Sequence, residues 1–131
     1  MANTTGPVLE ETAARFALLG DPTRLRLLHL LLERRESTVG ELAAAAGISM
    51  ANASQHLRRM ALGGILGRRR TGSLVHYRVV ESTIGQICEI VCASVEHRAR
   101  LRQPFPADPE SFPTDPESFP AEREPAAEAT R

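Results

Sequence analysis

The sequence lacks long hydrophobic runs, contains only two cysteines and has no lysine. No run approaches the roughly 18 apolar residues of a membrane span, and the N-terminus does not have the basic-then-apolar layout of a signal peptide. Two cysteines cannot build the disulfide framework that staples small secreted domains. We therefore expect a cytoplasmic protein with free thiols and no membrane partner.

The length of 131 residues fits one small domain with tails and excludes a multidomain enzyme. The chain has neither a glycine-rich nucleotide loop nor a recurring nucleophile, base and acid set, so we expect no enzymatic activity. We predict a flexible N-terminus over residues 1–7, a folded domain over 8–102 and a separate tail over 103–131.

The net charge of zero hides an asymmetry. Residues 1–104 hold 14 arginines against 9 acidic residues, and residues 105–131 hold 2 against 7, which gives +5 and −5. Six of the arginines lie between Arg58 and Arg78. Such a concentration indicates a phosphate-binding surface, although a solvated charged face would explain the charge alone equally well.

The tail is acidic and rich in proline. A seven-residue repeat places Phe-Pro pairs at 105–106, 112–113 and 119–120, with DPES between them. Proline at this density disfavours both helix and sheet, so the tail is predicted to be disordered. A solubilising role is favoured over a short-motif ligand or an acidic competitor for the basic surface.

Helical patterns begin near the N-terminus. Residues 8–19 have the apolar spacing of a first helix, and Asp21 with Pro22 then supplies an N-cap and a first helical position. The second helix is predicted to reach about Arg35. Its expected buried stripe consists of Leu25, Leu28 and Leu32.

Two shorter helices follow. Thr38 and Glu41 form a capping box for a helix that Gly47 ends, and Ser49 caps another helix over about 50–62. Two short helices separated by Gly-Ile-Ser predict a helix-turn-helix. The faces turned away from the core are predicted to carry Ala51, Asn52, Ser54, Gln55, Arg58 and Arg59, which suits a helix that enters the major groove.

The pattern then changes to a period of two residues. The arginines of 68–70, the Thr-Gly-Ser of 71–73 and the alternation over 74–80 predict a β-hairpin with a basic arm. Beside a helix-turn-helix such a hairpin is a wing, which can contact the DNA backbone or the minor groove. A last helix is predicted from Ser82 to about Arg102.

These elements, taken in order, resemble those of a known family. DPTRLRLL, GEL, S-x-x-x-x-S-x-H-L and R-R-x-G-x-x-V-x-Y-R occur within residues 19–79 with the spacing of the ArsR/SmtB family of repressors. The resemblance covers about Phe16 to His97. It implies a mainly α, dimeric winged helix-turn-helix fold of about five helices plus the wing. It also implies a homodimeric repressor that binds an imperfect palindrome in double-stranded DNA and leaves it when an effector arrives.

The resemblance makes residues 50–60 the recognition helix. The implied DNA contacts are Ser49, Asn52, Ser54, Gln55, Arg58 and Arg59 in this region, with Arg68, Arg69, Arg70 and Ser73 in the wing. Asn52 and Gln55 can read adenine edges, whereas the arginines are favoured as phosphate contacts. For His56, packing or a phosphate contact is favoured over metal ligation. His29 is predicted to be a partly buried helix residue.

The family binds metal ions at two recurrent places. The Cys-x-Cys site before the recognition helix corresponds here to residues 37–40, which contain no thiol. The site on the last helix corresponds to Glu81, Thr83, Ser94 and His97. Of these, Glu81 and His97 are the candidate metal ligands, so a divalent transition metal is a possible effector and no cofactor is required.

The stretch ICEIVCASVEH holds both cysteines. Cys88 shares a helical stripe with Ile84, Val91 and Val95, and Cys92 lies at the edge of that stripe. Packing is therefore the favoured role, because free cysteine is among the most buried residues. The alternative is that Cys88 or Cys92 meets its counterpart across a dimer axis, as a thiol sensor or a thiolate metal site.

We therefore predict a sequence-specific DNA-binding transcriptional regulator. The alternative is a winged-helix interaction module that does not bind DNA and uses the Phe-Pro tail as its working part. The intact basic wing favours the first hypothesis. Binding to duplex DNA with a steep inverse dependence on salt would distinguish the two.

Overall fold

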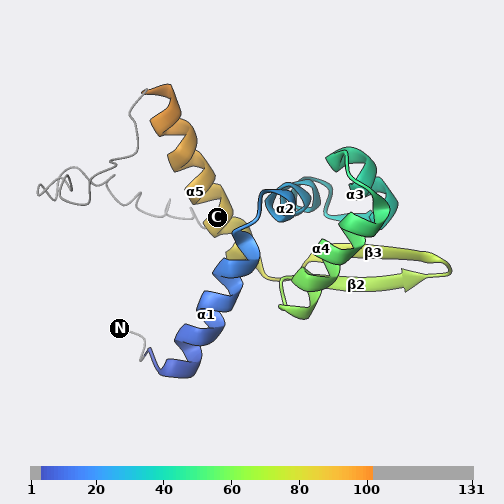
Figure 1. Ribbon diagram of the computed structural model, residues 1–131, viewed down its shortest axis with the longest axis horizontal. Helices are drawn as coiled ribbons and strands as arrows, with labels where there is room; N and C mark the ends of the chain where they lie inside the picture. The colour runs from blue at the N-terminus through green and yellow to red at the C-terminus, as the bar shows by residue number, and fades with distance from the viewer. Residues whose placement is uncertain (1–3, 102–131) are drawn as a thin grey trace, which may run out of the picture. The chain divides into compact units, whose positions relative to one another are not determined.

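The computed structural model describes residues 4–101 (Figure 1). The predicted tail at 103–131 and the first three residues of the predicted flexible N-terminus lie outside the described residues. The elements are α1 (Gly6–Leu19), α2 (Pro22–Arg34), β1 (Glu36–Thr38), α3 (Val39–Ala46), α4 (Met50–Leu62), β2 (Leu66–Thr71), β3 (Leu74–Val79) and α5 (Ser82–Arg100).

The described residues form five helices and a small antiparallel sheet, which confirms the predicted winged helix-turn-helix. β2 and β3 pair from Leu66 opposite Val79 to Thr71 opposite Leu74, so the hairpin closes in two residues. The strand order is β1-β3-β2. β1 was not predicted, because three residues are too few for a periodicity to be detected.

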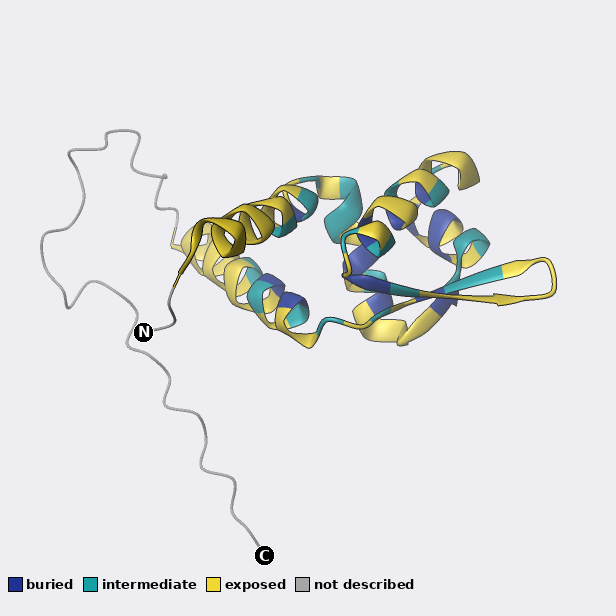
Figure 2. Ribbon diagram, turned by 90° about the horizontal axis from the view of Figure 1, so that it is seen from below, coloured by how far each residue is buried: buried dark blue, intermediate teal, exposed yellow. Residues whose placement is uncertain are grey.

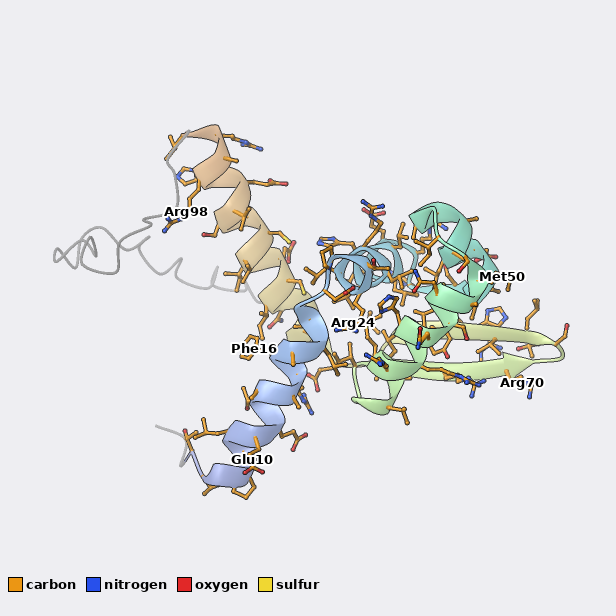
Figure 3. All side chains as sticks on the ribbon, viewed as in Figure 1. Glu10, Phe16, Arg24, Met50, Arg70 and Arg98 are labelled. Atoms are coloured by element: carbon orange, nitrogen blue, oxygen red, sulfur yellow. The ribbon has the colours of Figure 1, made fainter. Side chains whose placement is uncertain are left out.

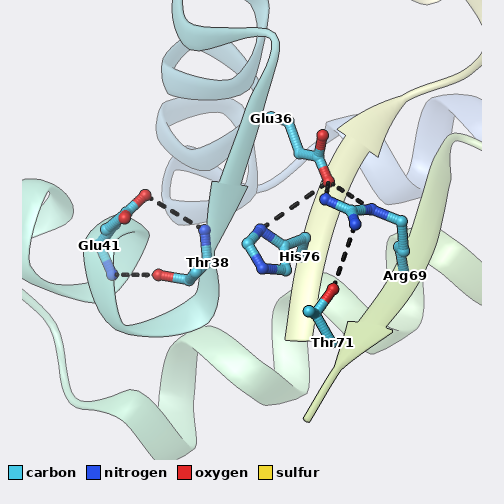
Figure 4. A network of polar contacts seen from close by, with 6 residues as sticks. All are labelled: Glu36, Thr38, Glu41, Arg69, Thr71 and His76. Carbon is cyan, nitrogen blue, oxygen red and sulfur yellow. Dashed lines mark hydrogen bonds and ion pairs between the residues drawn. The ribbon is translucent and has the colours of Figure 1, made fainter. Parts of the chain in front are cut away.

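Local capping fixes the helix-turn-helix. The Thr38 hydroxyl accepts the Glu41 N–H at 3.2 Å, and the Glu41 carboxylate accepts the Thr38 N–H at 3.3 Å (Figure 4). Gly47 ends α3 with a φ of +68°, a region that favours glycine. The Ser49 hydroxyl accepts the Asn52 N–H at 3.1 Å and begins α4. These contacts confirm the predicted capping box and both ends of the turn.

The core lies where α2, α3 and α4 meet the sheet (Figure 2). Its largest fully buried side chains are Leu27, Leu28, Leu31, Leu42, Leu57, Met60, Ile65 and Tyr77. The predicted stripe of α2 was wrong in one position, because Leu32 is 39% exposed. α3, α4 and β3 all contact α2, and the face that they cover is centred on Leu27 and Leu31.

The helix-to-helix junctions use arginines as caps. The Arg24 Nε donates to the Leu18 carbonyl at 2.6 Å, and Arg26 donates to the Ala46 carbonyl at 3.3 Å. Each bond satisfies a carbonyl in a last helical turn, which has no partner within its own helix. Figure 3 shows Arg24 where α1 meets α2. These guanidinium groups are therefore structural.

The chain divides into two units after Cys92. The first unit holds the core, the helix-turn-helix and the wing. The described residues of the second unit, 93–101, are exposed and include an ion pair between Arg100 and Glu96 at 3.8 Å. None of the helices within residues 4–101 has the length and apolar character needed to cross a membrane.

Candidate nucleic-acid interface

α4 has an apolar inner face, which packs into the core, and a polar outer face. Ala53, Leu57 and Met60 are completely buried. The exposed candidates on α4 are Asn52, Gln55, Arg58 and Arg59, and Ser54 is half-buried. The structure thus gathers the predicted contacts of this helix on the side away from the core, except that the Ser49 hydroxyl also serves as the N-cap.

The wing presents a second group of candidates. Gly72 has a φ of +60° in the two-residue turn, where a side chain would strain the backbone. Arg68 and Arg70 on β2 are exposed, as is Ser73 at the turn. The main chains of Arg68 and Arg70 pair with β3, but neither guanidinium group has a hydrogen bond or ion pair within residues 4–101, so both are available to a phosphate.

α4 and the wing line the same cavity. A cavity of about 330 Å³ is lined by the start of α3, by Met50, Ala51 and Ser54 of α4, and by Ser73 and Leu74 of the wing. In Figure 3, Met50 and Arg70 lie toward the same side of the core. The two predicted DNA-contacting elements are therefore adjacent in space. Met50 and Leu74 are 61% and 54% exposed and were not predicted as part of this surface.

Arg69 differs from its neighbours on β2. Its guanidinium donates to the Glu36 carboxylate through Nη2 at 2.7 Å and Nε at 2.9 Å, and to the Thr71 hydroxyl at 3.1 Å (Figure 4). The His76 Nδ1 lies 3.8 Å from the same carboxylate. Arg69 therefore crosses the sheet to β1 instead of standing free beside Arg68 and Arg70.

This contact has a pH dependence. The hydrogen bonds from Arg69 hold the pKa of Glu36 below its ordinary value, so the ionised carboxylate stabilises the fold. The stabilisation is complete above about pH 4.3, the pKa of a free glutamate, and is lost as the pH falls through the lowered folded pKa. We expect Glu36→Gln to lower the Tm at pH 7 and to leave it unchanged at about pH 2. A Tm decrease of equal size at both pH values would contradict the contact.

The candidate metal ligands Glu81 and His97 belong to different units of the chain. The Thr83 hydroxyl, the Arg15 side chain and the Thr83 N–H hold the pKa of Glu81 below its ordinary value, and Arg15 lies 3.2 Å from the carboxylate. His97 is exposed in the second unit. His56 is half-buried on α4, and its Nδ1 is buried without a hydrogen-bond partner. Residues 4–101 contain no group of three or more side chains placed to hold a metal.

The cysteines have different surroundings. Cys88 is 4% exposed, and burial followed by the neighbouring Cys92 raises the pKa of its thiol, which agrees with the predicted packing role. Cys92 is half-buried, and its Sγ lies 3.5 Å from the Nε2 of His29. His29 was predicted to be partly buried but is exposed, because α2 turns Leu27, Leu28 and Leu31 toward the core instead.

Known proteins are similar to this chain in sequence and in fold. A family described as a helix-turn-helix domain matches residues 19–68. A probable mercury resistance operon repressor of Streptomyces lividans is 34% identical over 93 residues, which are 70% of this chain and 74% of that protein.

Solved structures give the same result. The AntR antimony-specific transcriptional repressor superposes with a TM-score of 0.70 at 32% identity, over 76% of this chain and 90% of that one. The homodimeric winged helix-turn-helix DNA-binding domain of a possible ArsR-family regulator from Mycobacterium bovis has a TM-score of 0.63 at 26% identity, over 73% and 91% of the two chains.

Proposed function

Because this chain belongs to the ArsR/SmtB family of winged helix-turn-helix transcriptional regulators, we propose that it acts as a cytoplasmic homodimeric repressor. Each protomer presents one α4 and one wing to an imperfect palindrome in duplex DNA, so that the symmetry of the dimer matches that of the operator. The observation that carries this proposal is that α4 and the wing line one cavity, and that the exposed predicted contacts belong to the surface of these two elements.

Within this surface, two kinds of contact have different roles. Asn52 and Gln55 are exposed amides on successive turns of α4, and an amide can bind an adenine edge with two hydrogen bonds. Arg58 and Arg59 on α4, with Arg68 and Arg70 on the wing, bind phosphates and set the position of the protein on the duplex. Ser54 and Ser73 line the cavity between α4 and the wing, and their hydroxyl groups donate hydrogen bonds to the DNA backbone.

The proposal includes release by an effector. The names of the relatives refer to mercury and antimony, which are soft, thiophilic elements. We propose an effector of that class or a thiol signal for this chain. A winged-helix interaction module without DNA binding is disfavoured, because the matching proteins are transcriptional regulators. Family membership also points away from catalysis.

The wing can be tested through salt dependence. Removing one phosphate-binding side chain should reduce the slope of log K against log salt by about 0.9. We expect Arg68→Gln combined with Arg70→Gln to weaken binding on every duplex and to flatten this slope. Fluorescence anisotropy at salt concentrations from about 50 to 200 mM measures both effects.

Arg69→Gln is the matched control. The Glu36 carboxylate already offsets the charge of Arg69, so this variant should change the slope less than either neighbouring substitution. An unchanged slope for the double variant would remove the wing from the interface.

A further inference from the structure

A contact between α2 and α5 lies outside the DNA-contacting surface. The Cys92 Sγ and the His29 Nε2 are 3.5 Å apart, although 63 positions separate the two residues in the sequence. His29 is exposed and Cys92 is half-buried, so water and dissolved ions can reach the pair. A thiol and an imidazole are the two side chains that zinc-like cations bind most readily.

The separation of the two atoms fits a tetrahedral ion. With a metal–sulfur distance of about 2.3 Å and a metal–nitrogen distance of about 2.05 Å, atoms 3.5 Å apart subtend about 107° at the metal. This is close to the tetrahedral angle, so the two atoms need not move apart to accept such an ion. A linear ion would require the two atoms to separate to about 4.3 Å. We propose that His29 and Cys92 form a binding site for a thiophilic, tetrahedral divalent cation.

The surroundings provide further oxygen ligands. Glu33 lies four residues after His29 on α2, and Glu89 lies three residues before Cys92 on α5, so each carboxylate shares a helix face with one ligand. His29, Glu33 and Glu89 together line a cavity of about 550 Å³. The two carboxylates do not complete a cluster with the pair in the described arrangement. Water, or a carboxylate that rotates toward the ion, therefore completes the coordination.

The neighbouring thiol does not belong to this site. Cys88 is 4% exposed, and burial raises the pKa of its thiol, which disfavours the thiolate that a metal requires. Glu81 is held by Arg15 and Thr83, so it is also committed elsewhere. The pair of His29 and Cys92 thus includes neither Glu81 nor His97, and it pairs Cys92 with a histidine of its own chain instead of with a second Cys92.

Binding follows a simple proton balance. The Cys92 thiol releases one proton to solvent and its sulfur forms a bond to the cation, while neutral His29 donates the lone pair of Nε2 and keeps its proton on Nδ1. No electron transfer is involved. Binding should therefore strengthen as the pH rises and should release protons in unbuffered solution.

The site would connect two helices with different tasks. α2 contacts α3 and α4 of the helix-turn-helix, and α5 carries Cys92. A cation held by both helices fixes α5 against α2 and can change how α4 is presented to DNA. This regulatory part rests on the proposed function, whereas the binding site rests on the geometry alone.

Cobalt(II) is the direct probe of the site. Titrating the full-length, reduced chain with cobalt(II) should produce a thiolate-to-cobalt charge-transfer band and the intense visible bands of tetrahedral cobalt, with one ion bound per chain. Zinc(II) should displace it. His29→Gln and Cys92→Ser should each weaken binding by more than about 100-fold, beyond the roughly 10- to 100-fold cost of losing an outer-shell partner.

Cys88→Ser is the matched control, because it removes the other thiol of the same helix. It should keep the tetrahedral spectrum, and metal-free circular dichroism should show that all three variants are folded. Absence of a charge-transfer band in the wild type would overturn the proposal. So would a band that disappears in Cys88→Ser, or one that persists in His29→Gln. Rapid alkylation of Cys92 without cobalt binding would assign the pair to thiol reactivity instead.

A second titration separates the site from the DNA-binding function. Zinc(II) should change the affinity of the wild type for operator duplex and leave that of Cys92→Ser unchanged. Cobalt binding without any DNA binding would contradict the proposed function and keep the site. DNA binding without cobalt binding would support the proposed function and overturn the metal site.

Discussion

Replacing Asn52 and Gln55 together with alanine is expected to weaken operator binding by about 2–6 kcal/mol per half-site, because each amide that pairs with an adenine would contribute about 1–3 kcal/mol. Both side chains are exposed on α4, so the fold should not change. Affinity for random duplex should stay close to that of the wild type, because the arginines that we propose to bind phosphate are untouched. Anisotropy competition between operator and random duplex measures the difference.

Gln86→Ala is the control for this double variant. Gln86 is an exposed amide on α5 and is not one of the predicted DNA contacts, so its removal should leave both affinities unchanged. Equal decreases in affinity on operator and random DNA for the double variant would show that Asn52 and Gln55 do not read bases.

The second large effect concerns stability. Leu57 is completely buried in α4, within the core that α2 and α3 share with the sheet. Leu57→Ala should lower the free energy of unfolding by about 2–5 kcal/mol, because it removes buried apolar surface and leaves a cavity. Urea unfolding at a fixed protein concentration is the appropriate measurement, since formation of the proposed dimer would also contribute to stability.

Leu62→Ala provides the comparison within the same helix. Leu62 is 90% exposed, so the same chemical change should alter stability by no more than about 0.5 kcal/mol. A similar decrease for both variants would mean that the assigned inner and outer faces of α4 are wrong.

The helix-turn-helix could be predicted because its signals are local. The cap at Ser49, the capping box at Thr38 and the end of α3 at Gly47 each depend on residues within four positions of one another. The hairpin was also predictable, since its alternation and its turn are contiguous. Side chains on the outer face of α4 then follow from the helical period, and the structure places them as expected.

The contacts that sequence reasoning missed join distant residues. Arg69 and Glu36 are 33 positions apart and meet only because β1 pairs with β3. His29 and Cys92 meet only because α5 returns to α2. A periodicity can show that α2 is amphipathic. Whether Leu31 or Leu32 is buried depends on which side of α2 the helices α3 and α4 and the strand β3 cover. Such differences arise from tertiary packing and have no local signal.

The most direct test of the account is an anisotropy titration of the reduced, metal-free protein with duplex from upstream of its own gene. We predict tight binding whose affinity falls by about 10³- to 10⁵-fold between 50 and 200 mM salt, as expected for 6–10 phosphate contacts in a dimer. Random duplex should bind far less tightly. No binding, or binding that is insensitive to salt, would contradict the proposal that this protein binds DNA through α4 and the wing arginines.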